Sequence, residues 1–205
     1  MGVLSTDEIK ARLALTGRER LVVAPILEPE EQLRAGQASI DVRLGCRFRL
    51  VEATSEDVID TINRPRRPPT RPPVFIPLGR WMVLHPHQLL LAETLEFVRL
   101  PPDLMSYVAG RSTWARDGLL VATAVGIHPG FAGCVTLELR NLGEVPICLF
   151  PGDLIAQLFI EQVIGPSTSG PLVNSQFSGG GGPRRGDHRY KVTDEKLRKL
   201  CGHRS

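Results

Sequence analysis

The chain has 205 residues, of which 42% are hydrophobic, and this is enough for one domain with a sizeable core. Its net charge of +3 is too small for a surface that binds nucleic-acid polymers. The sequence lacks the roughly 20-residue apolar run that spans a bilayer, and it lacks the pattern of a signal peptide. The four cysteines are far apart and include no C-x-x-C pair, so we expect a cytoplasmic protein with reduced thiols and no membrane partner.

The first elements are predicted within the N-terminal 45 residues. Residues 5–8 (S-T-D-E) form a capping box in which Ser5 caps a short helix and Glu8 reaches back. Residues 38–45 (A-S-I-D-V-R-L-G) alternate apolar and polar side chains and end at glycine. This alternation is typical of a half-buried strand.

Residues 61–73 (T-I-N-R-P-R-R-P-P-T-R-P-P) contain too many prolines for a helix or a central strand. They predict an exposed, polyproline-like loop inserted into the domain. Its arginines could form a basic docking site, but we favour a solvated spacer because proline-rich loops commonly serve as one.

From residue 74 to residue 163, short apolar runs are separated by proline and glycine turns. This spacing predicts a mainly β fold, a distorted antiparallel β-barrel or jelly roll with a few short helices. We expect residues 1–163 to form this β domain. Residues 164–205 are rich in glycine and polar residues, so they predict a flexible tail with a short helix over 193–200, and this tail is a candidate active-site lid.

Two common nucleotide-site motifs are absent from the sequence. An H-x-E motif with a P-C-x-x-C partner, which holds the zinc of many base deaminases, does not occur. A G-x-x-x-x-G-K-[ST] phosphate loop does not occur either. His85 and His87 could begin a metal site on one face of a strand, but no third ligand lies nearby in the sequence, so we favour a loop or packing role. We therefore expect no metal ligands from the protein and no zinc.

A series of ordered motifs runs through the chain: A-S-I-D-V-R-L-G at 38–45, L-A-E-T-L-E at 91–96, G-R-S-T-W-A-R at 110–116, T-A at 123–124, P-G-F at 129–131, T-L-E-L at 136–139, P-G at 151–152 and A-Q-L at 156–158. Together they resemble the signature of dCTP deaminases, in the dCTP deaminase/dUTPase superfamily, over most of residues 5–163. The resemblance implies a dUTPase-type β fold. It also implies an enzyme of pyrimidine deoxynucleotide metabolism that hydrolyses dCTP to dUTP and ammonia.

The chemistry of residues 110–116 agrees with a triphosphate ligand. A Gly-Arg-Ser-Thr turn offers a guanidinium fork, two hydroxyls and backbone N–H groups within one short stretch. Arg111, Ser112 and Thr113 are therefore the predicted phosphate contacts.

Glu138 is an isolated carboxylate in the apolar stretch V-T-L-E-L, where it must be paired, protonated or functional. Deamination needs water to attack C4 of cytosine, and it needs protons moved to the ring nitrogen and to the leaving ammonia. One carboxylate with a raised pKa can carry each proton. The resemblance implies that Glu138 is this shuttle and that Arg116 and Ser112 orient the glutamate and the water. A structural ion pair is the alternative for Glu138.

The resemblance implies further properties of the site. It implies Mg²⁺ bound with the triphosphate, dTTP as a candidate inhibitor, and a homotrimer with active sites at the subunit boundaries. The remaining substrate contacts that it implies are Trp114, Ala115, Ala124, His128, Thr136, Leu137 and Gln157.

The sequence departs from the family pattern at His128, where family members usually carry an aspartate that faces the sugar. A histidine can still hydrogen-bond the 3′-hydroxyl, but it cannot replace a permanent carboxylate. Two alternative functions stay open: a dUTP diphosphatase or bifunctional dUMP-forming deaminase, and a non-catalytic nucleotide-binding regulator. The missing aspartate argues against the first and gives some weight to the second.

Overall fold

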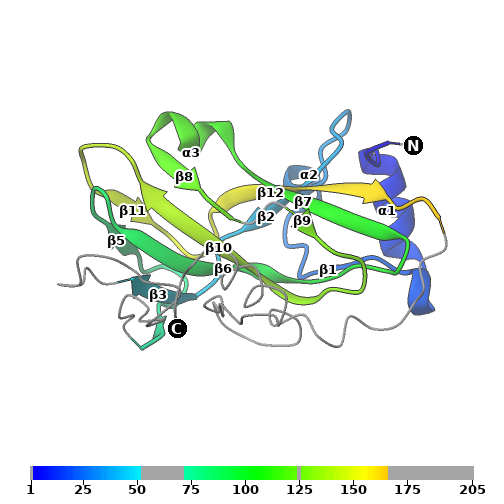
Figure 1. The fold of residues 1–205 in the computed structure, drawn as a ribbon, viewed down its shortest axis with the longest axis horizontal. Coiled ribbons are helices and arrows are strands. Elements are labelled where there is room, and N and C mark those ends of the chain that lie inside the picture. The colour runs from blue at the N-terminus through cyan, green and yellow to red at the C-terminus, as the bar shows by residue number, and fades with distance from the viewer. Residues whose placement is uncertain (1, 52–71, 124–125, 166–205) are drawn as a thin grey trace, which may run out of the picture.

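The computed structural model describes residues 2–51, 72–123 and 126–165, and it shows a mainly β protein with short helices (Figure 1). Most of the predicted 61–73 loop, Ala124 and most of the predicted tail lie outside the described residues. The helices are α1 (Thr6–Ala14), the 3-10 helix η1 (Gly17–Glu19), α2 (Pro29–Gln32) and α3 (Ser112–Arg116). The strands are β1 (Val22–Ala24), β2 (Ile40–Arg43), β3 (Arg47–Val51), β4 (Val74–Phe75), β5 (Met82–Leu84), β6 (Leu89–Arg99), β7 (Leu104–Gly110), β8 (Leu119–Val121), β9 (Gly126–Ile127), β10 (Ala132–Asn141), β11 (Ile147–Leu149) and β12 (Leu154–Gln162).

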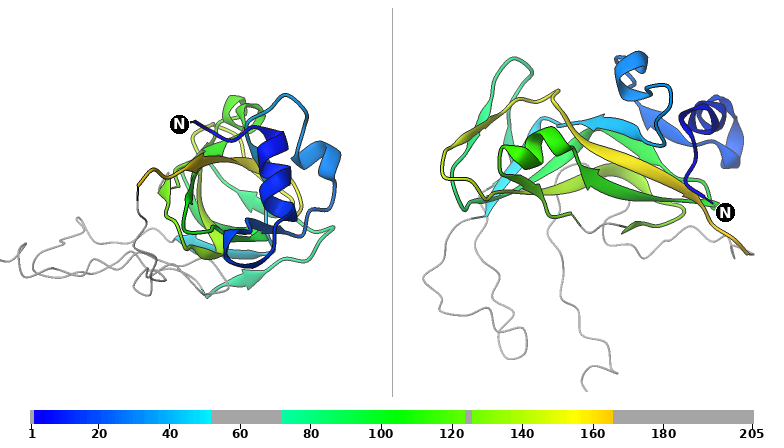
Figure 2. Two further views of the ribbon diagram at one scale, coloured as in Figure 1. Left: turned by 90° about the vertical axis from the view of Figure 1, so that its right-hand side faces the viewer. Right: turned by 90° about the horizontal axis from the view of Figure 1, so that it is seen from above.

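The N-terminal helix starts where its capping residue predicts. The hydroxyl of Ser5 accepts a hydrogen bond from the backbone N–H of Glu8 at 3.2 Å, which satisfies one of the free N–H groups of the first turn. Ile9 is fully buried in the core, whereas Leu15, just past the helix, is 40% exposed. Helix α1 therefore packs on the domain by one face (Figure 2).

The described strands form three antiparallel sheets. The largest has the order β4-β3-β6-β10-β8, and β1 pairs with β6 as well. A second sheet has the order β2-β12-β7-β9, and β5 with β11 makes a two-stranded third. The mainly β, dUTPase-like fold predicted from the sequence is confirmed, although the described strands form separate sheets instead of one closed barrel.

One hydrophobic core lies between the two large sheets, as the alternation of burial along their central strands shows. On β10 the side chains of Val135, Leu137 and Leu139 are at most 5% exposed, while their neighbours along the strand are less buried. On β12 Leu158 and Ile160 are fully buried. Because strand side chains alternate between faces, each sheet also has an outer face that points away from this core.

Strand β2 differs from the half-buried strand that its sequence predicts. Asp41, the polar residue expected to point into solvent, is only 1% exposed. Burial of a carboxylate needs polar partners to offset its lost hydration. Asp41 has them in Gln157 and Arg111.

His85 and His87 lie in the turn between β5 and β6 and not on a strand face. Both side chains are exposed, and the backbone of His87 has a positive φ of 64°. Its N–H donates to the carbonyl of Asn141 at 2.8 Å, so this turn is fastened to the end of β10. Among the described helices, none is long and apolar enough to cross a membrane.

Candidate active site

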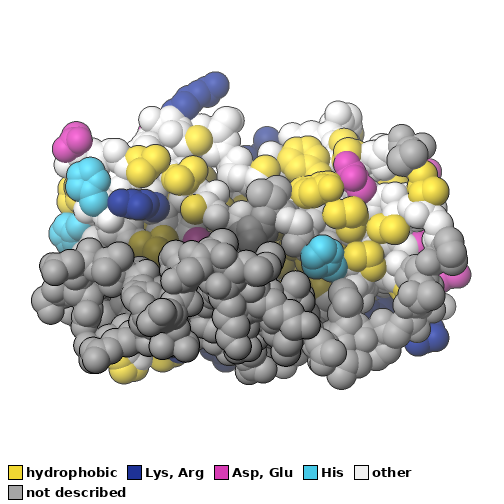
Figure 3. All heavy atoms as spheres, in the orientation of Figure 1, with side chains coloured by type: hydrophobic (Ala, Val, Ile, Leu, Met, Phe, Trp, Pro, Cys, Tyr) yellow, Lys and Arg dark blue, Asp and Glu magenta, His cyan; other side chains and the backbone are white. Residues whose placement is uncertain are grey.

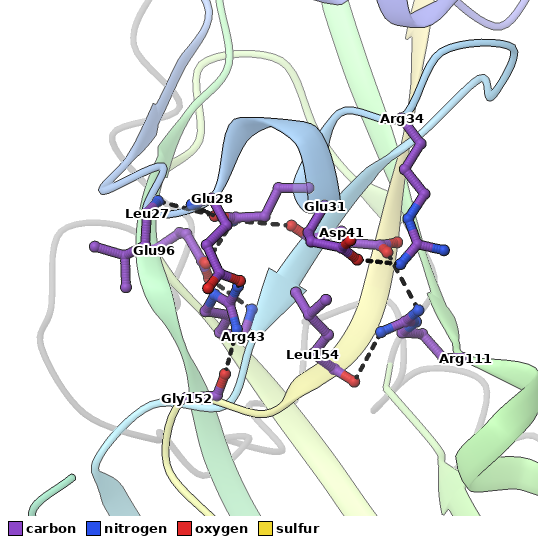
Figure 4. A network of polar contacts seen from close by, with 11 residues as sticks. Leu27, Glu28, Glu31, Arg34, Asp41, Arg43, Glu96, Arg111, Gly152 and Leu154 are labelled. Atoms are coloured by element: carbon purple, nitrogen blue, oxygen red, sulfur yellow. Dashed lines mark hydrogen bonds and ion pairs between the residues drawn. The ribbon is translucent and has the colours of Figure 1, made fainter.

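Asp41, Gln157 and Arg111 meet on the outer face of the four-stranded sheet. Figure 4 shows Asp41 and Arg111 facing each other. Gln157 on β12 is paired in register with Asp41 on β2 and with Ala109 on β7, so these three side chains stand in one row. Gln157 Nε2 donates to Asp41 Oδ1 at 2.8 Å. Arg111 Nη2 lies 3.6 Å from Asp41 Oδ2. The sequence-predicted contacts Arg111 and Gln157 are thus brought together by a third residue.

The Arg111 backbone and the Trp114 ring fasten the start of α3 to β12. The N–H of Arg111 donates to the carbonyl of Ile155 at 3.3 Å, and Trp114 Nε1 donates to the carbonyl of Leu154 at 2.9 Å. Arg111 Nη1 also approaches the Leu154 carbonyl, at 3.5 Å. Trp114 is half-buried against the core, so its indole anchors the turn.

The other predicted residues of this turn point outward. Ser112, Thr113, Ala115 and Arg116 are all exposed on α3. The hydroxyls of Ser112 and Thr113 and the guanidinium of Arg116 therefore face solvent. Gly110, just before them, packs closely against Val121, since a Cβ there would meet Val121 at 3.1 Å.

Glu138 lies on the outer face of the six-stranded sheet. It is half-buried on β10, between the buried side chains of Leu137 and Leu139, which face the core. Its N–H donates to Thr123 Oγ1 at 3.1 Å, and its carbonyl accepts from the N–H of Ala122 at 2.7 Å. These bonds hold the predicted catalytic strand beside the segment that leads to Ala124, which itself lies outside the described residues.

Thr136 and Leu137 sit on β10 beside Glu138 but face different ways. Thr136 is half-buried and, two residues from Glu138, shares its face of the strand. The side chain of Leu137 is fully buried in the core. If Leu137 contacts a nucleotide, as the sequence comparison predicts, it can do so only through its backbone.

His128 is exposed in the turn between β9 and β10. Its carbonyl accepts a hydrogen bond from the N–H of Phe131 at 3.2 Å, and Gly130 inside the turn has a φ of +79°. The turn fixes the backbone while leaving the imidazole facing solvent. Contact of His128 with a sugar remains a prediction.

A buried polar network lies behind β2. Glu96 on β6 is fully buried; its Oε1 accepts from Gln32 Nε2 at 2.9 Å and its Oε2 from the N–H of Arg43 at 2.9 Å. Gln32 Nε2 also donates to the carbonyl of Asp41 at 3.1 Å. Burial raises the pKa of Glu96 to about 7, and the hydrogen bond from the Arg43 backbone lowers it only in part.

Arg43 ties this network to the turn before β12. Its Nη1 donates to the carbonyl of Gly152 at 2.6 Å, and its Nη2 lies 2.5 Å from Glu28 Oε2 (Figure 4). Polar side chains therefore hold β2 at Asp41 and at Arg43, which restrains the strand that carries Asp41.

Comparison with known proteins identifies the family of this chain. The family model described as dCTP deaminase-like matches residues 3–163. The chain belongs to this family. Two relatives, from Methanobrevibacter smithii and Methanosphaera stadtmanae, are both named dCTP deaminase, dUMP-forming, and each is 33% identical over 168 residues. These alignments cover 82% of this chain and 84% and 82% of the two relatives.

Among solved structures, the 2′-deoxycytidine 5′-triphosphate deaminase of Agrobacterium tumefaciens has a similar fold, with a TM-score of 0.57. The match is 23% identical and covers 78% of this chain and 46% of that chain, so it spans less than half the length of that protein. At this identity the likeness concerns the fold alone.

For a dCTP deaminase-like protein, the residue that sequence reasoning missed is Asp41. Asp41 belongs to the A-S-I-D-V-R-L-G motif at 38–45, but it is not among the predicted site residues. A signal was present, since an aspartate between Ile40 and Val42 interrupts an apolar strand. Its partners Arg111 and Gln157 are far away in sequence, so only the fold reveals why the charge is tolerated.

Proposed function

We propose that the protein deaminates dCTP by direct hydrolysis, releasing dUTP and ammonia. The observation that carries this proposal is the half-buried Glu138 on the outer face of β10, in a chain of the dCTP deaminase-like family. Partial burial shields this carboxylate from bulk water while leaving part of it accessible to a ligand, as a group that takes and returns protons during a reaction must be.

In this mechanism Glu138 takes a proton from water as the water oxygen attacks C4 of cytosine. It delivers that proton to the ring nitrogen, and it then moves the proton of the new C4 hydroxyl to the amino group, which leaves as ammonia while the C4 carbonyl forms. Arg116 and Ser112 orient the carboxylate and the water, and the backbone near Ala124 holds the base. The rate then comes from positioning and proton transfer.

Arg111, Ser112 and Thr113 bind the triphosphate in this proposal. Support comes from Arg111, whose side chain is 22% exposed, and from the exposed hydroxyls on α3. Mg²⁺ arrives with the nucleotide, whose phosphate oxygens are the hard ligands that this ion prefers. We expect dTTP, which carries the same deoxyribose triphosphate, to compete for the same contacts.

We also propose that the active site is completed between the subunits of a homotrimer. Glu138 points outward from the six-stranded sheet, whereas Gln157 and Arg111 lie on the outer face of the four-stranded sheet. In Figure 3, hydrophobic side chains gather over the part of the molecule where β7, β9 and β12 lie in Figure 1. Tyr107 and Phe159 are half-buried cross-strand partners there. A neighbouring chain on this face could bring its Glu138 to the Arg111 of the first.

A second candidate function is the further hydrolysis of dUTP to dUMP. Two relatives that are 33% identical to this chain carry the name dCTP deaminase, dUMP-forming. Against it stands His128, where the family's sugar-facing aspartate is usual. The product therefore decides between the two candidates.

We place the enzyme in the cytoplasm with its nucleotide substrate. Cys46, Cys134 and Cys148 are free thiols, as a reducing compartment would keep them. Burial, and then the negative charge of Glu93, raise the pKa of the Cys46 and Cys134 thiols, so both stay protonated and unreactive at neutral pH.

The test is to incubate the protein with dCTP and Mg²⁺ and to separate dCTP, dUTP and dUMP over time. The proposal predicts equal amounts of dUTP and ammonia. Accumulation of dUMP without dUTP would establish the second candidate. Binding of dCTP without any turnover would instead indicate a nucleotide-binding regulator.

A further inference from the structure

We propose that Asp41 is a positioning residue that aligns Arg111 for the triphosphate, and sets the orientation of the Gln157 amide, before the nucleotide arrives. This inference rests on the proposed function, in which Arg111 contacts phosphate. Its basis is one buried carboxylate whose two oxygens face two different sequence-predicted binding residues.

The two carboxylate oxygens of Asp41 contact different residues. Oδ1 accepts a hydrogen bond of 2.8 Å from Gln157 Nε2. A carboxylate can only accept, so it fixes which end of the Gln157 amide faces inward and leaves Oε1 as the end that can turn toward a ligand. Gln157 Oε1 can therefore accept a hydrogen bond from a ligand. It does not compete with Arg111 for the phosphate oxygens, which are themselves acceptors.

Oδ2 of Asp41 is buried and makes no hydrogen bond among the described residues. It faces Arg111 Nη2 at 3.6 Å, which is an ion pair longer than a hydrogen bond. The guanidinium is held by charge and by the Leu154 carbonyl, yet its N–H groups are not used up by Asp41. With 22% of its side chain exposed, Arg111 keeps an edge available for phosphate.

The surroundings keep Asp41 in place. Its own carbonyl accepts from Gln32, and two residues later Arg43 is fastened to Glu96 and Gly152. A carboxylate fixed in this way sets the direction of an arginine without the entropy cost of ordering it during binding. Other charges near this pair include Arg34 and Glu31, which pair with each other beside it (Figure 4).

The test is a double-mutant cycle with Asp41→Asn and Arg111→Ala, measured as the Kd for dCTP in the presence of Mg²⁺. Asp41→Asn keeps the shape but turns an amide toward Arg111, so we expect the affinity for dCTP to fall roughly 10- to 100-fold, the range for a charge-assisted contact. In the Arg111→Ala background the same change should have almost no effect, because Asp41 acts through Arg111.

A ligand without phosphate separates positioning from general damage to the fold. The inhibition constant of deoxycytidine should be unchanged in Asp41→Asn, and kcat should change far less than KM. Asp103→Asn is the matched control, since Asp103 pairs with Arg12 on α1, away from this site. Equal losses for dCTP and deoxycytidine, or additive effects in the cycle, would overturn the proposal.

A measurement on the wild-type chain covers the case in which Asp41→Asn does not fold. The guanidinium ¹⁵N resonances of Arg111, assigned with Arg111→Lys, should show restricted rotation in the protein without nucleotide. Free rotation before nucleotide binding contradicts the inference. If the wild-type protein bound no dCTP at all, the proposed function would fail, whereas an additive cycle in an active enzyme would reject only the role of Asp41.

Discussion

The outer faces of the two large sheets differ in how completely their candidate residues are already arranged. On the four-stranded sheet, Asp41 contacts both Gln157 and Arg111 at distances of at most 3.6 Å. On the six-stranded sheet Glu138 is half-buried, and His128, which directly follows β9 of the four-stranded sheet, is exposed. One chain therefore holds two parts of the candidate site. We call Asp41 and the two residues that it contacts, Gln157 and Arg111, the binding half, and we call Glu138 on β10 the reacting half.

The difference has a physical reason. A triphosphate binds through fixed charges, and fixing them beforehand lowers the entropy cost of binding. A proton shuttle instead needs a pKa close to the working pH, which depends on how far the group is shielded from water. If a neighbouring subunit covers Glu138, assembly of the trimer would determine how far this carboxylate is shielded from water.

The largest expected effect concerns the reacting half. Glu138→Gln keeps the shape of the side chain and removes the proton shuttle, so kcat should fall about 10²- to 10⁴-fold. The Kd for dCTP should stay close to that of the wild type, because the binding half is untouched. Glu19→Gln, in the exposed η1 helix, is the control. Steady-state kinetics and calorimetry measure the two quantities; near-normal turnover by Glu138→Gln would remove Glu138 from the mechanism.

Glu96, in the buried polar network behind β2, should make the free energy of unfolding depend on pH. Burial raises the pKa of Glu96 from 4.5 to about 7, so the folded state keeps this proton to a higher pH than the unfolded state does. The stabilisation from Glu96 is therefore complete below about pH 4.5 and is lost as the pH rises to about 7, by on the order of 3 kcal/mol at most.

Glu96→Gln cannot ionise, so the difference in unfolding free energy between variant and wild type should shift in favour of the variant between pH 5 and pH 8. Urea unfolding at both pH values measures this difference. A constant difference across the range would mean that Glu96 has the same pKa folded and unfolded.

The smallest expected effect concerns His128. His128→Asp supplies the family's usual carboxylate, so we expect KM for dCTP to fall roughly 3- to 10-fold, the value of one hydrogen bond, and some dUMP to form. His128→Ala should raise KM and weaken the preference for deoxyribose over ribose. If neither variant changes KM or the sugar preference, His128 does not touch the sugar.

Much of the fold follows from local sequence patterns. Ser5 caps α1 as its motif predicts, and the turn-rich sequence from residue 74 onward folds into antiparallel strands. These features depend on near neighbours in the chain. The burial of Asp41 was missed because the alternation rule assumes that a polar strand residue faces water.

The arrangement of the candidate site could be predicted only in part. The sequence predicts Arg111 and Glu138 as members of one site, yet nothing local shows that β7, which leads to Arg111, and β10, which carries Glu138, belong to different sheets. The link between Asp41 and Gln157 depends on the pairing of β2 with β12, more than a hundred residues apart. Strand pairing at that separation is a property of the whole fold.

The most direct test of the two-half account is complementation between two impaired chains. Glu138→Gln and Arg111→Ala are co-expressed in equal amounts, all the oligomers are purified together without selection, and deamination is measured at low dCTP. If each site joins the Arg111 half of one chain to the Glu138 half of its neighbour, random equal mixing should leave half times half, about one quarter, of the sites fully intact. The account predicts recovery near a quarter of wild-type activity, far above either variant alone. Activity no greater than the average of the two variants would contradict it, because both halves would then belong to the same chain's site.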